Sequence, residues 1–157
     1  MDEEYLNIYN NLIKLTRNKS LYQNLDNTDT FSDRLIVFLF HFAFFLKKYK
    51  NDNSKSKLQI IYDFNFKQIE LSIREIGYGD VSINKQMKIY INLFHSIIEK
   101  IEKWDSLDID AKSALLGKYF KSSKNSNYIV KYFDKYSSFL SKTTLNYFTN
   151  DIIEPKI

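Results

Sequence analysis

Cysteine is absent from this chain of 157 residues, and glycine, proline and histidine are scarce. Without cysteine there is no disulfide, thiolate metal site or thiol nucleophile, which fits a reducing compartment. Three glycines and one proline, Pro155, leave few turn residues for a multi-stranded sheet, a dinucleotide-binding turn or a phosphate-binding loop. These folds are therefore poor candidates, whereas a helical chain of this length buries enough surface to fold alone.

Hydrophobic residues recur at three- and four-residue spacing along most of the chain, which predicts helices. The most apolar run, Leu35 to Leu46, lies in a predicted helix from Phe31 to Tyr49 that opens on a capping box at Thr30. Twelve residues are too few to span a bilayer, so this run predicts a buried core helix. We expect an all-α fold, a single compact bundle of about six or seven helices over residues 1–157.

Polar segments predict where these helices end. We expect a short turn over 21–25, linkers over 51–56 and 105–110, and a weaker helix over 111–120. A stripe of apolar residues from Leu58 to Ile76 predicts one helix face, closed by a left-handed Gly77. Asp80 or Ser82 is expected to cap the next helix, and the C-terminal residues around Tyr147 and Phe148 are expected to fray.

The chain carries little that resembles catalytic machinery. His41 lies among phenylalanines, where a hydrogen-bonded core histidine is the common case, and His95 with Glu99 supplies only two spaced metal ligands. Neither a phosphate-binding loop nor a nucleophile elbow is present. We expect no enzymatic activity, no cofactor and no metal site, although a deep pocket at either histidine and a ligand-induced spectrum would favour an enzyme or a haem-binding protein.

The formal net charge of +4 comes from the C-terminal half, since residues 1–80 hold equal numbers of basic and acidic side chains. Lysines interleaved with aromatic residues suit contact with RNA or with an anionic membrane surface, although a solvated lysine face over a core is the ordinary alternative. DNA is not an expected partner. The residues of this candidate basic surface are Lys112, Lys118, Lys121, Lys124, Lys131 and Lys135.

The segment Arg74-Glu75-Ile76-Gly77-Tyr78-Gly79-Asp80 holds two of the three glycines. One interpretation is a helix end, a tight connection and a new helix start, which accounts for every residue except the Arg-Glu pair. The other is a turn whose backbone amides approach an anion. Spacing alone leaves both open.

Several phrases in order resemble one family, the ubiquinol-cytochrome c chaperones, over about residues 5–104. The strongest phrase is 71–80, which ends in the glycine-containing turn. Residues 105–157 resemble the family only in being helical. The other matching positions are Leu21-Tyr22, Asp29-Thr30, Arg34, His41, Lys85, Met87, Lys88 and Phe94.

The resemblance implies a non-catalytic helical chaperone that binds newly made cytochrome b and promotes assembly of ubiquinol-cytochrome c reductase, complex III. Relatives in mitochondria sit near the ribosomal tunnel exit and work with a small partner protein. Because the chain opens without a transit peptide, it looks like a bacterial member, cytoplasmic and peripheral at the inner membrane. The alternative is a ribosome- or RNA-binding module that uses the C-terminal lysines.

The resemblance also suggests which residues form a client-binding or polar centre. We expect this centre to shape a client groove rather than to do chemistry. Its candidate residues are Arg34, His41, Arg74, Glu75, Gly77, Gly79 and Asp80.

Overall fold

The computed structural model describes residues 2–23, 30–51, 55–120 and 126–150, and every regular element within these ranges is a helix. Six of the helices have nine residues or more, which confirms the predicted all-α bundle. The elements in chain order are α1 (Asp2–Thr16), α2 (Lys19–Gln23), α3 (Phe31–Tyr49), α4 (Lys55–Ile76), α5 (Asp80–Ile101), the 3₁₀ helix η1 (Trp104–Ser106), α6 (Ile109–Gly117), α7 (Ser126–Ser141) and α8 (Leu145–Thr149).

The capping box predicted at Thr30 fixes the start of α3. The Thr30 hydroxyl oxygen accepts a hydrogen bond from the backbone N–H of Asp33 at 3.2 Å, and the hydroxyl donates to the Asp33 carboxylate at 2.7 Å. These bonds satisfy an amide that the first helical turn leaves without a partner. The helix then runs to Tyr49, as the apolar pattern predicts.

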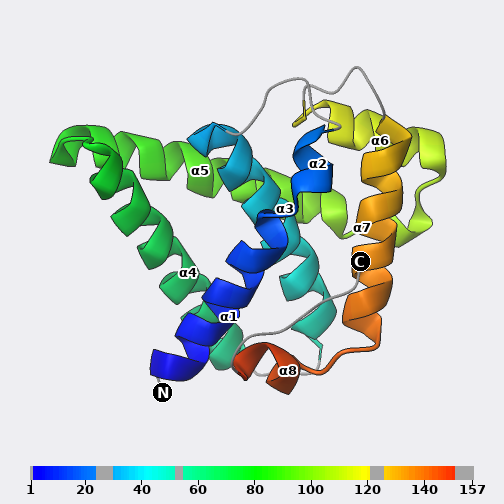
Figure 1. Cartoon of the computed structure of the whole chain (residues 1–157), viewed down its shortest axis with the longest axis horizontal. Helices are drawn as coiled ribbons and strands as arrows, with labels where there is room; N and C mark the ends of the chain where they lie inside the picture. The colour runs from blue at the N-terminus through cyan, green and yellow to red at the C-terminus, as the bar shows by residue number, and fades with distance from the viewer. Residues whose placement is uncertain (1, 24–29, 52–54, 121–125, 151–157) are drawn as a thin grey trace.

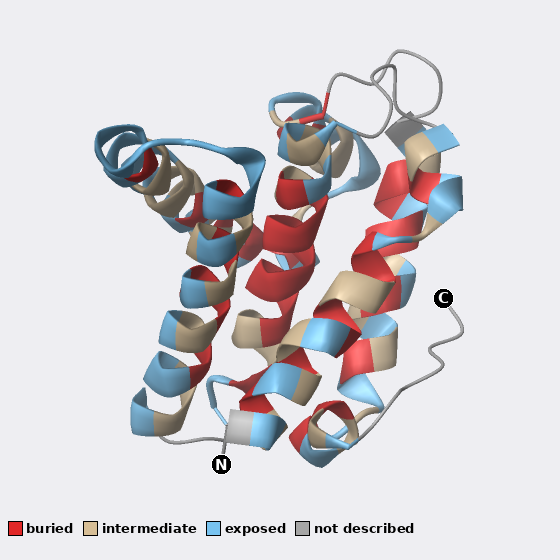
Figure 2. Ribbon diagram, turned by 60° about the vertical axis from the view of Figure 1, so that its left-hand side comes forward, coloured by how far each residue is buried: buried red, intermediate tan, exposed pale blue. Residues whose placement is uncertain are grey.

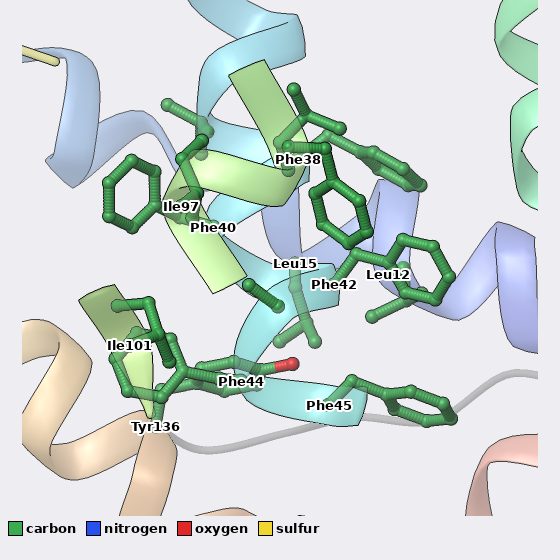
Figure 3. Close-up of a cluster of buried hydrophobic side chains, with 14 of the residues drawn as sticks. Leu12, Leu15, Phe38, Phe40, Phe42, Phe44, Phe45, Ile97, Ile101 and Tyr136 are labelled. Atoms are coloured by element: carbon green, nitrogen blue, oxygen red, sulfur yellow. The ribbon is translucent and has the colours of Figure 1, made fainter. Parts of the chain in front are cut away.

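Helix α3 is buried on nearly all sides and forms the centre of the bundle (Figures 1 and 2). Figure 3 shows its side chains pointing outward toward Leu12 and Leu15 of α1, Ile97 and Ile101 of α5, and Tyr136 of α7. An amphipathic surface helix would bury one stripe only, so α3 is the element around which the others pack. Its buried residues are Leu35, Val37, Phe38, Leu39, Phe40, His41, Phe42, Ala43, Phe44, Phe45 and Tyr49.

Aromatic rings make the contacts between α3 and its neighbours. The Phe42 ring stacks on Phe94 of α5 with centroids 5.2 Å apart, and the Phe44 ring stacks on Phe133 of α7 at 5.3 Å. Trp104 meets the Phe44 ring edge-on at 5.3 Å. The aromatic residues of the chain are therefore core residues first, and offset or edge-on pairs of this kind add to the burial term.

Helices α4 and α5, joined by residues 77–79, form a V on one side of the bundle, which we call the α4–α5 arm (Figure 1). The predicted apolar stripe of α4 is only partly buried. Phe66, Ile69 and Ile73 are in the core, whereas Ile76 is 52% exposed. The last turn of α4 lies at the apex of the V (Figure 1), an end that Figure 2 shows as mainly exposed.

Several local predictions were wrong. Residues 21–23, expected in a turn, belong to helix α2, and residues 24 and 25 lie outside the described residues. The N-cap of α5 is Gly79 rather than Asp80 or Ser82, because the Asp80 carboxylate accepts a hydrogen bond from Arg74 instead of capping a backbone amide. Helix α6 begins at Ile109, since Asp108 caps it through the N–H of Ala111.

The C-terminal segment is ordered by contacts with α1 rather than frayed. Phe148 in α8 is fully buried, and the Asn11 side-chain amide donates to the Phe148 carbonyl oxygen at 3.0 Å. The Asn7 amide donates to the Thr149 carbonyl oxygen at 3.0 Å. The sequence does not reveal these bonds, because they join residues more than 130 positions apart.

Replacing Phe44 tests the central position of α3. We expect Phe44→Ala to lower the free energy of unfolding by about 3–5 kcal/mol, because the buried ring stacks on Phe133 and leaves a cavity when removed. Phe139→Ala, which removes a half-buried ring on α7, should cost clearly less. Urea unfolding measures both, and equal losses would contradict a core centred on α3.

Candidate functional site

The 74–80 turn is a helix end followed directly by a helix start. Gly77 adopts φ +104° and its N–H donates to the Arg74 carbonyl oxygen at 3.0 Å, which confirms the left-handed position predicted for it. Glycine is favoured there because side chains of L-residues rarely adopt this backbone conformation. Gly79, with φ −73°, is the N-cap of α5.

An exposed ion-pair network crosses this turn. The Arg74 guanidinium donates to the Asp80 carboxylate at 2.8 Å and to the Glu70 carboxylate at 3.2 Å. The hydrogen bond from Arg74 lowers the pKa of the Glu70 carboxyl below its usual value. Because the network is exposed, its Coulomb energy is screened and it adds little to stability, but it links the last turn of α4 to the first residue of α5.

A small pocket opens between α1, α3 and α4, and Arg34 lies at its rim. Its cavity volume is about 140 Å³. Leu35, Phe38 and Ile69 form a buried floor. We call this the α1–α3–α4 pocket, and it is lined by Tyr9, Ile13, Thr16, Arg17, Phe31, Arg34, Leu35, Phe38, Ile69 and Ser72.

Charges gather around the polar edge of the α1–α3–α4 pocket. Burial raises the pKa of the Tyr9 phenol, while a hydrogen bond with Ser72 and the charge of Arg17 lower it and the charge of Glu75 raises it. Arg34 therefore lines the α1–α3–α4 pocket and Glu75 is exposed on the last turn of α4, whereas Arg74 and Asp80 pair across the 74–80 turn.

His41 is a core residue that joins α3 to α7. Its Nδ1–H donates to the Val37 carbonyl oxygen at 2.8 Å, and its Nε2 accepts from the Tyr132 hydroxyl at 2.6 Å. The Tyr136 hydroxyl in turn donates to the His41 carbonyl oxygen at 2.9 Å. This neutral tautomer uses both ring nitrogens, so His41 is the hydrogen-bonded core histidine and does not line the α1–α3–α4 pocket.

Burial lowers the pKa of His41 to about 4, against the smaller raising effect of its bond to the Val37 carbonyl. Burial also raises the pKa of both partner phenols, Tyr132 and Tyr136. All three groups are therefore neutral at neutral pH, which is what a dry core requires.

The lysines of the candidate basic surface differ in exposure: one is tied into the fold, and three others are exposed. The Lys112 side chain is only 14% exposed; it donates to the Asp134 carboxylate at 3.0 Å and lies over the Trp104 ring. Lys118 at the end of α6 is exposed, as are Lys131 and Lys135 one turn apart on α7. Lys121 and Lys124 lie outside the described residues.

His95 lines a second, broader depression, together with Tyr62, whose hydroxyl is 3.2 Å from the His95 Nε2. Lys47 and Lys50 lie at its edge, paired with Asp105 and Glu102. Across the described part of the chain, no group of three or more histidine and acidic side chains is arranged to hold a metal ion. In the same residues, no helix is both long and apolar enough to cross a membrane.

Comparison with known proteins decides the family. The ubiquinol-cytochrome C chaperone family matches residues 23–153. This chain belongs to that family. No curated protein and no solved structure matches it. The family match extends past Trp104 through α6, α7 and α8, so the C-terminal helices that carry the lysines lie within the family region.

Sequence reasoning missed the residues that complete each cluster. Arg17 and Ser72 join Arg34 at the pocket only because α1, α3 and α4 converge there. Tyr132 belongs to the lysine-rich stretch in sequence, yet its hydroxyl reaches His41 across the core. Neither relation has a local signal, because residue spacing reports on one helix at a time.

The buried imidazole makes stability depend on pH. Between pH 6.5 and about 4 the unfolded chain binds a proton at His41 that the folded chain excludes. His41 should therefore reduce the free energy of unfolding by about 3 kcal/mol as the pH falls from 7 to 4.

Urea unfolding at several pH values measures this slope in the wild type and in His41→Gln. The variant should lose the part that His41 contributes. His95→Gln removes the exposed histidine and is the matched control. A weaker pH dependence of the free energy of unfolding in His95→Gln, with none in His41→Gln, would contradict the assignment.

Gly77→Ala tests the backbone of the 74–80 turn. A methyl group added at Gly77 meets nothing within 4 Å, so any loss comes from the positive φ and should be about 1–2 kcal/mol. Gly117→Ala at the end of α6, which also meets nothing, should leave stability unchanged or raise it. Thermal unfolding compares the two, and a Gly77→Ala protein as stable as wild type would exclude strain at this position.

Proposed function

We propose that this chain is a non-catalytic assembly chaperone that binds newly synthesised cytochrome b and promotes assembly of ubiquinol-cytochrome c reductase, complex III. Membership of the family supports the chaperone role. The observation that supports a specific client-binding surface is the set of exposed apolar side chains on the α4–α5 arm.

Large exposed apolar side chains concentrate on the α4–α5 arm. Of the eight found among the described residues, six belong to it. Val81 is 86% exposed, and Ile76 and Tyr78 flank it at the apex, which Figure 2 shows as a mainly exposed end of the V. The six are Ile60, Leu71, Ile76, Tyr78, Val81 and Ile89.

Such a surface suits a client with apolar helices. Contiguous exposed apolar side chains mark interaction sites in soluble proteins. Cytochrome b emerges from the ribosome with transmembrane segments whose apolar faces have no partner in water, and covering them lowers the free energy of the unassembled protein. This role requires binding and release only, so no catalytic residue is assigned.

On this proposal the protein works peripherally at the cytoplasmic face of the inner membrane, because its client is inserted there. A position near the ribosomal tunnel exit and the anionic membrane surface would bring it to the client early. The exposed Lys118, Lys131 and Lys135 support such a position through their charge. We also propose that the protein works with a small partner protein.

The alternative is a ribosome- or RNA-binding module that depends on the same lysines. Lys112 gives it little support, since that ammonium pairs with Asp134 and packs on Trp104. Co-sedimentation with ribosomes that falls steeply with salt, and is lost when Lys118, Lys131 and Lys135 are changed to Gln, would favour this alternative.

Polar substitution at the arm apex tests the chaperone proposal. When each protein is expressed in a deletion strain, we expect the double variant Ile76→Asn with Val81→Asn to support several-fold less cytochrome b than the wild type. Both exposed side chains would lose apolar contact with the client. Haem absorbance of membranes and quantification of complex III provide the measurement.

Ile109→Asn is the matched control, because Ile109 is also exposed, at 61%, but lies on α6. Its cytochrome b level should equal that of the wild type. Circular dichroism and thermal unfolding check that each variant folds. Equal cytochrome b levels in the apex variant and the wild type would contradict the proposal.

A further inference from the structure

A depression lies at the end of the bundle where α3 ends and α4 begins, beside α8 (Figure 1). Its volume is about 470 Å³, a size typical of sites for small molecules. Three segments far apart in the sequence form it: the last turn of α3, the first turn of α4 and the chain from the end of α7 into α8. We call it the Lys48 pocket, and it is lined by Lys48, Tyr49, Lys57 and residues 141–146.

Lysines supply the charge of the Lys48 pocket. Lys48 is half-buried and Lys142 is exposed, and within the described residues neither ammonium group has an acidic partner. Lys57 pairs with Glu4 at 3.4 Å, so these two charges offset each other. Among the described residues that line the pocket, none is acidic. Lys48 and Lys142 therefore leave an excess of positive charge, which attracts an anion.

Neutral hydrogen-bond donors lie beside these ammonium groups. Thr144 is the N-cap residue of α8, yet its hydroxyl makes no capping hydrogen bond. The Asn146 side chain is exposed at the same pocket. The hydroxyls of Ser141 and Thr143 already donate to carbonyl oxygens of α7, so they contribute no donor. The described lining thus offers two ammonium groups, one hydroxyl and one amide to a ligand.

These donors suit a phosphate group better than a carboxylate. An ammonium binds phosphate as a point charge, whereas carboxylate recognition favours the paired donors of a guanidinium, and the described lining includes no arginine. A phosphate group also offers several oxygens, so it can accept from both ammonium groups and the hydroxyl at once. RNA fits less well, because Tyr49, the aromatic residue of the described lining, is 2% exposed and leaves no ring on which a base could stack.

We propose that the Lys48 pocket binds a phosphate group, held by the Lys48 and Lys142 ammonium groups together with the Thr144 hydroxyl and the Asn146 amide. A soluble phosphate ester and the headgroup of an anionic phospholipid share this chemistry. The inference goes beyond the proposed function, because the pocket contains neither the exposed apolar side chains of the α4–α5 arm nor the lysines of the candidate basic surface.

Isothermal titration calorimetry with inorganic phosphate, on the whole chain and at constant ionic strength, tests this assignment. We expect saturable binding of phosphate, and none of acetate at the same concentration. The double variant Lys48→Gln with Lys142→Gln should bind phosphate about tenfold more weakly than the wild type. Absence of phosphate binding in the wild type, unchanged binding in the double variant, or equal binding of acetate would overturn the proposal.

The matched control changes two exposed lysines elsewhere, Lys19→Gln with Lys103→Gln, and should bind phosphate like the wild type. Because it removes the same charge from the chain, an equal loss in both double variants would show attraction by net charge alone and contradict the assignment. Thermal unfolding in buffer without phosphate identifies any variant that fails to fold. If the Lys48 variant does not fold, Lys142→Gln, at an exposed position, should still weaken phosphate binding about threefold.

Vesicle flotation distinguishes the two sources of the phosphate group. Flotation with vesicles of phosphatidylcholine and phosphatidylglycerol, lost in the Lys48→Gln with Lys142→Gln variant, would support the proposal and assign the pocket to a lipid headgroup. Phosphate binding without flotation would support it with a soluble phosphate ester as the ligand. Binding of an RNA oligonucleotide that depends on these two lysines, with no binding of inorganic phosphate, would refute it.

Discussion

The burial of α3 on nearly all its sides is the constraint on which the rest of the structure depends. A helix with apolar residues around most of its circumference is stable in water only when other helices cover it. Helices α1, α5 and α7 do so through leucine, isoleucine and aromatic side chains. The one polar side chain within its apolar run, His41, is accommodated because Val37 and Tyr132 satisfy both of its nitrogens.

Coverage of α3 decides what remains available at the surface. Helices α4 and α5 contribute Phe66 and Phe94 to the core near Phe42, and beyond these residues they extend to an apex with exposed Ile76 and Val81. The N-terminal turns of α3 are covered less completely, which leaves the α1–α3–α4 pocket beside Arg34. The apolar apex of the α4–α5 arm and the α1–α3–α4 pocket are thus two consequences of the same packing.

The sequence predicts the features that depend on neighbouring residues. The Thr30 cap, the limits of α3 and the left-handed Gly77 are all confirmed, because each arises within a few positions of chain. The features that it does not predict depend on distant partners. Asp80 pairs with Arg74 instead of capping α5, Phe148 is buried against α1, and Lys112 pairs with Asp134 rather than adding to an exposed basic surface.

Site-specific photocrosslinking during cytochrome b synthesis tests the central claim most directly. A photoreactive residue at Val81, the most exposed large apolar side chain described, should crosslink to nascent or newly released cytochrome b. The same residue at Ile109 on α6 should not. Crosslinks to cytochrome b from both positions, or from Ile109 alone, would contradict the account, as would crosslinks from Val81 only to ribosomal RNA or protein.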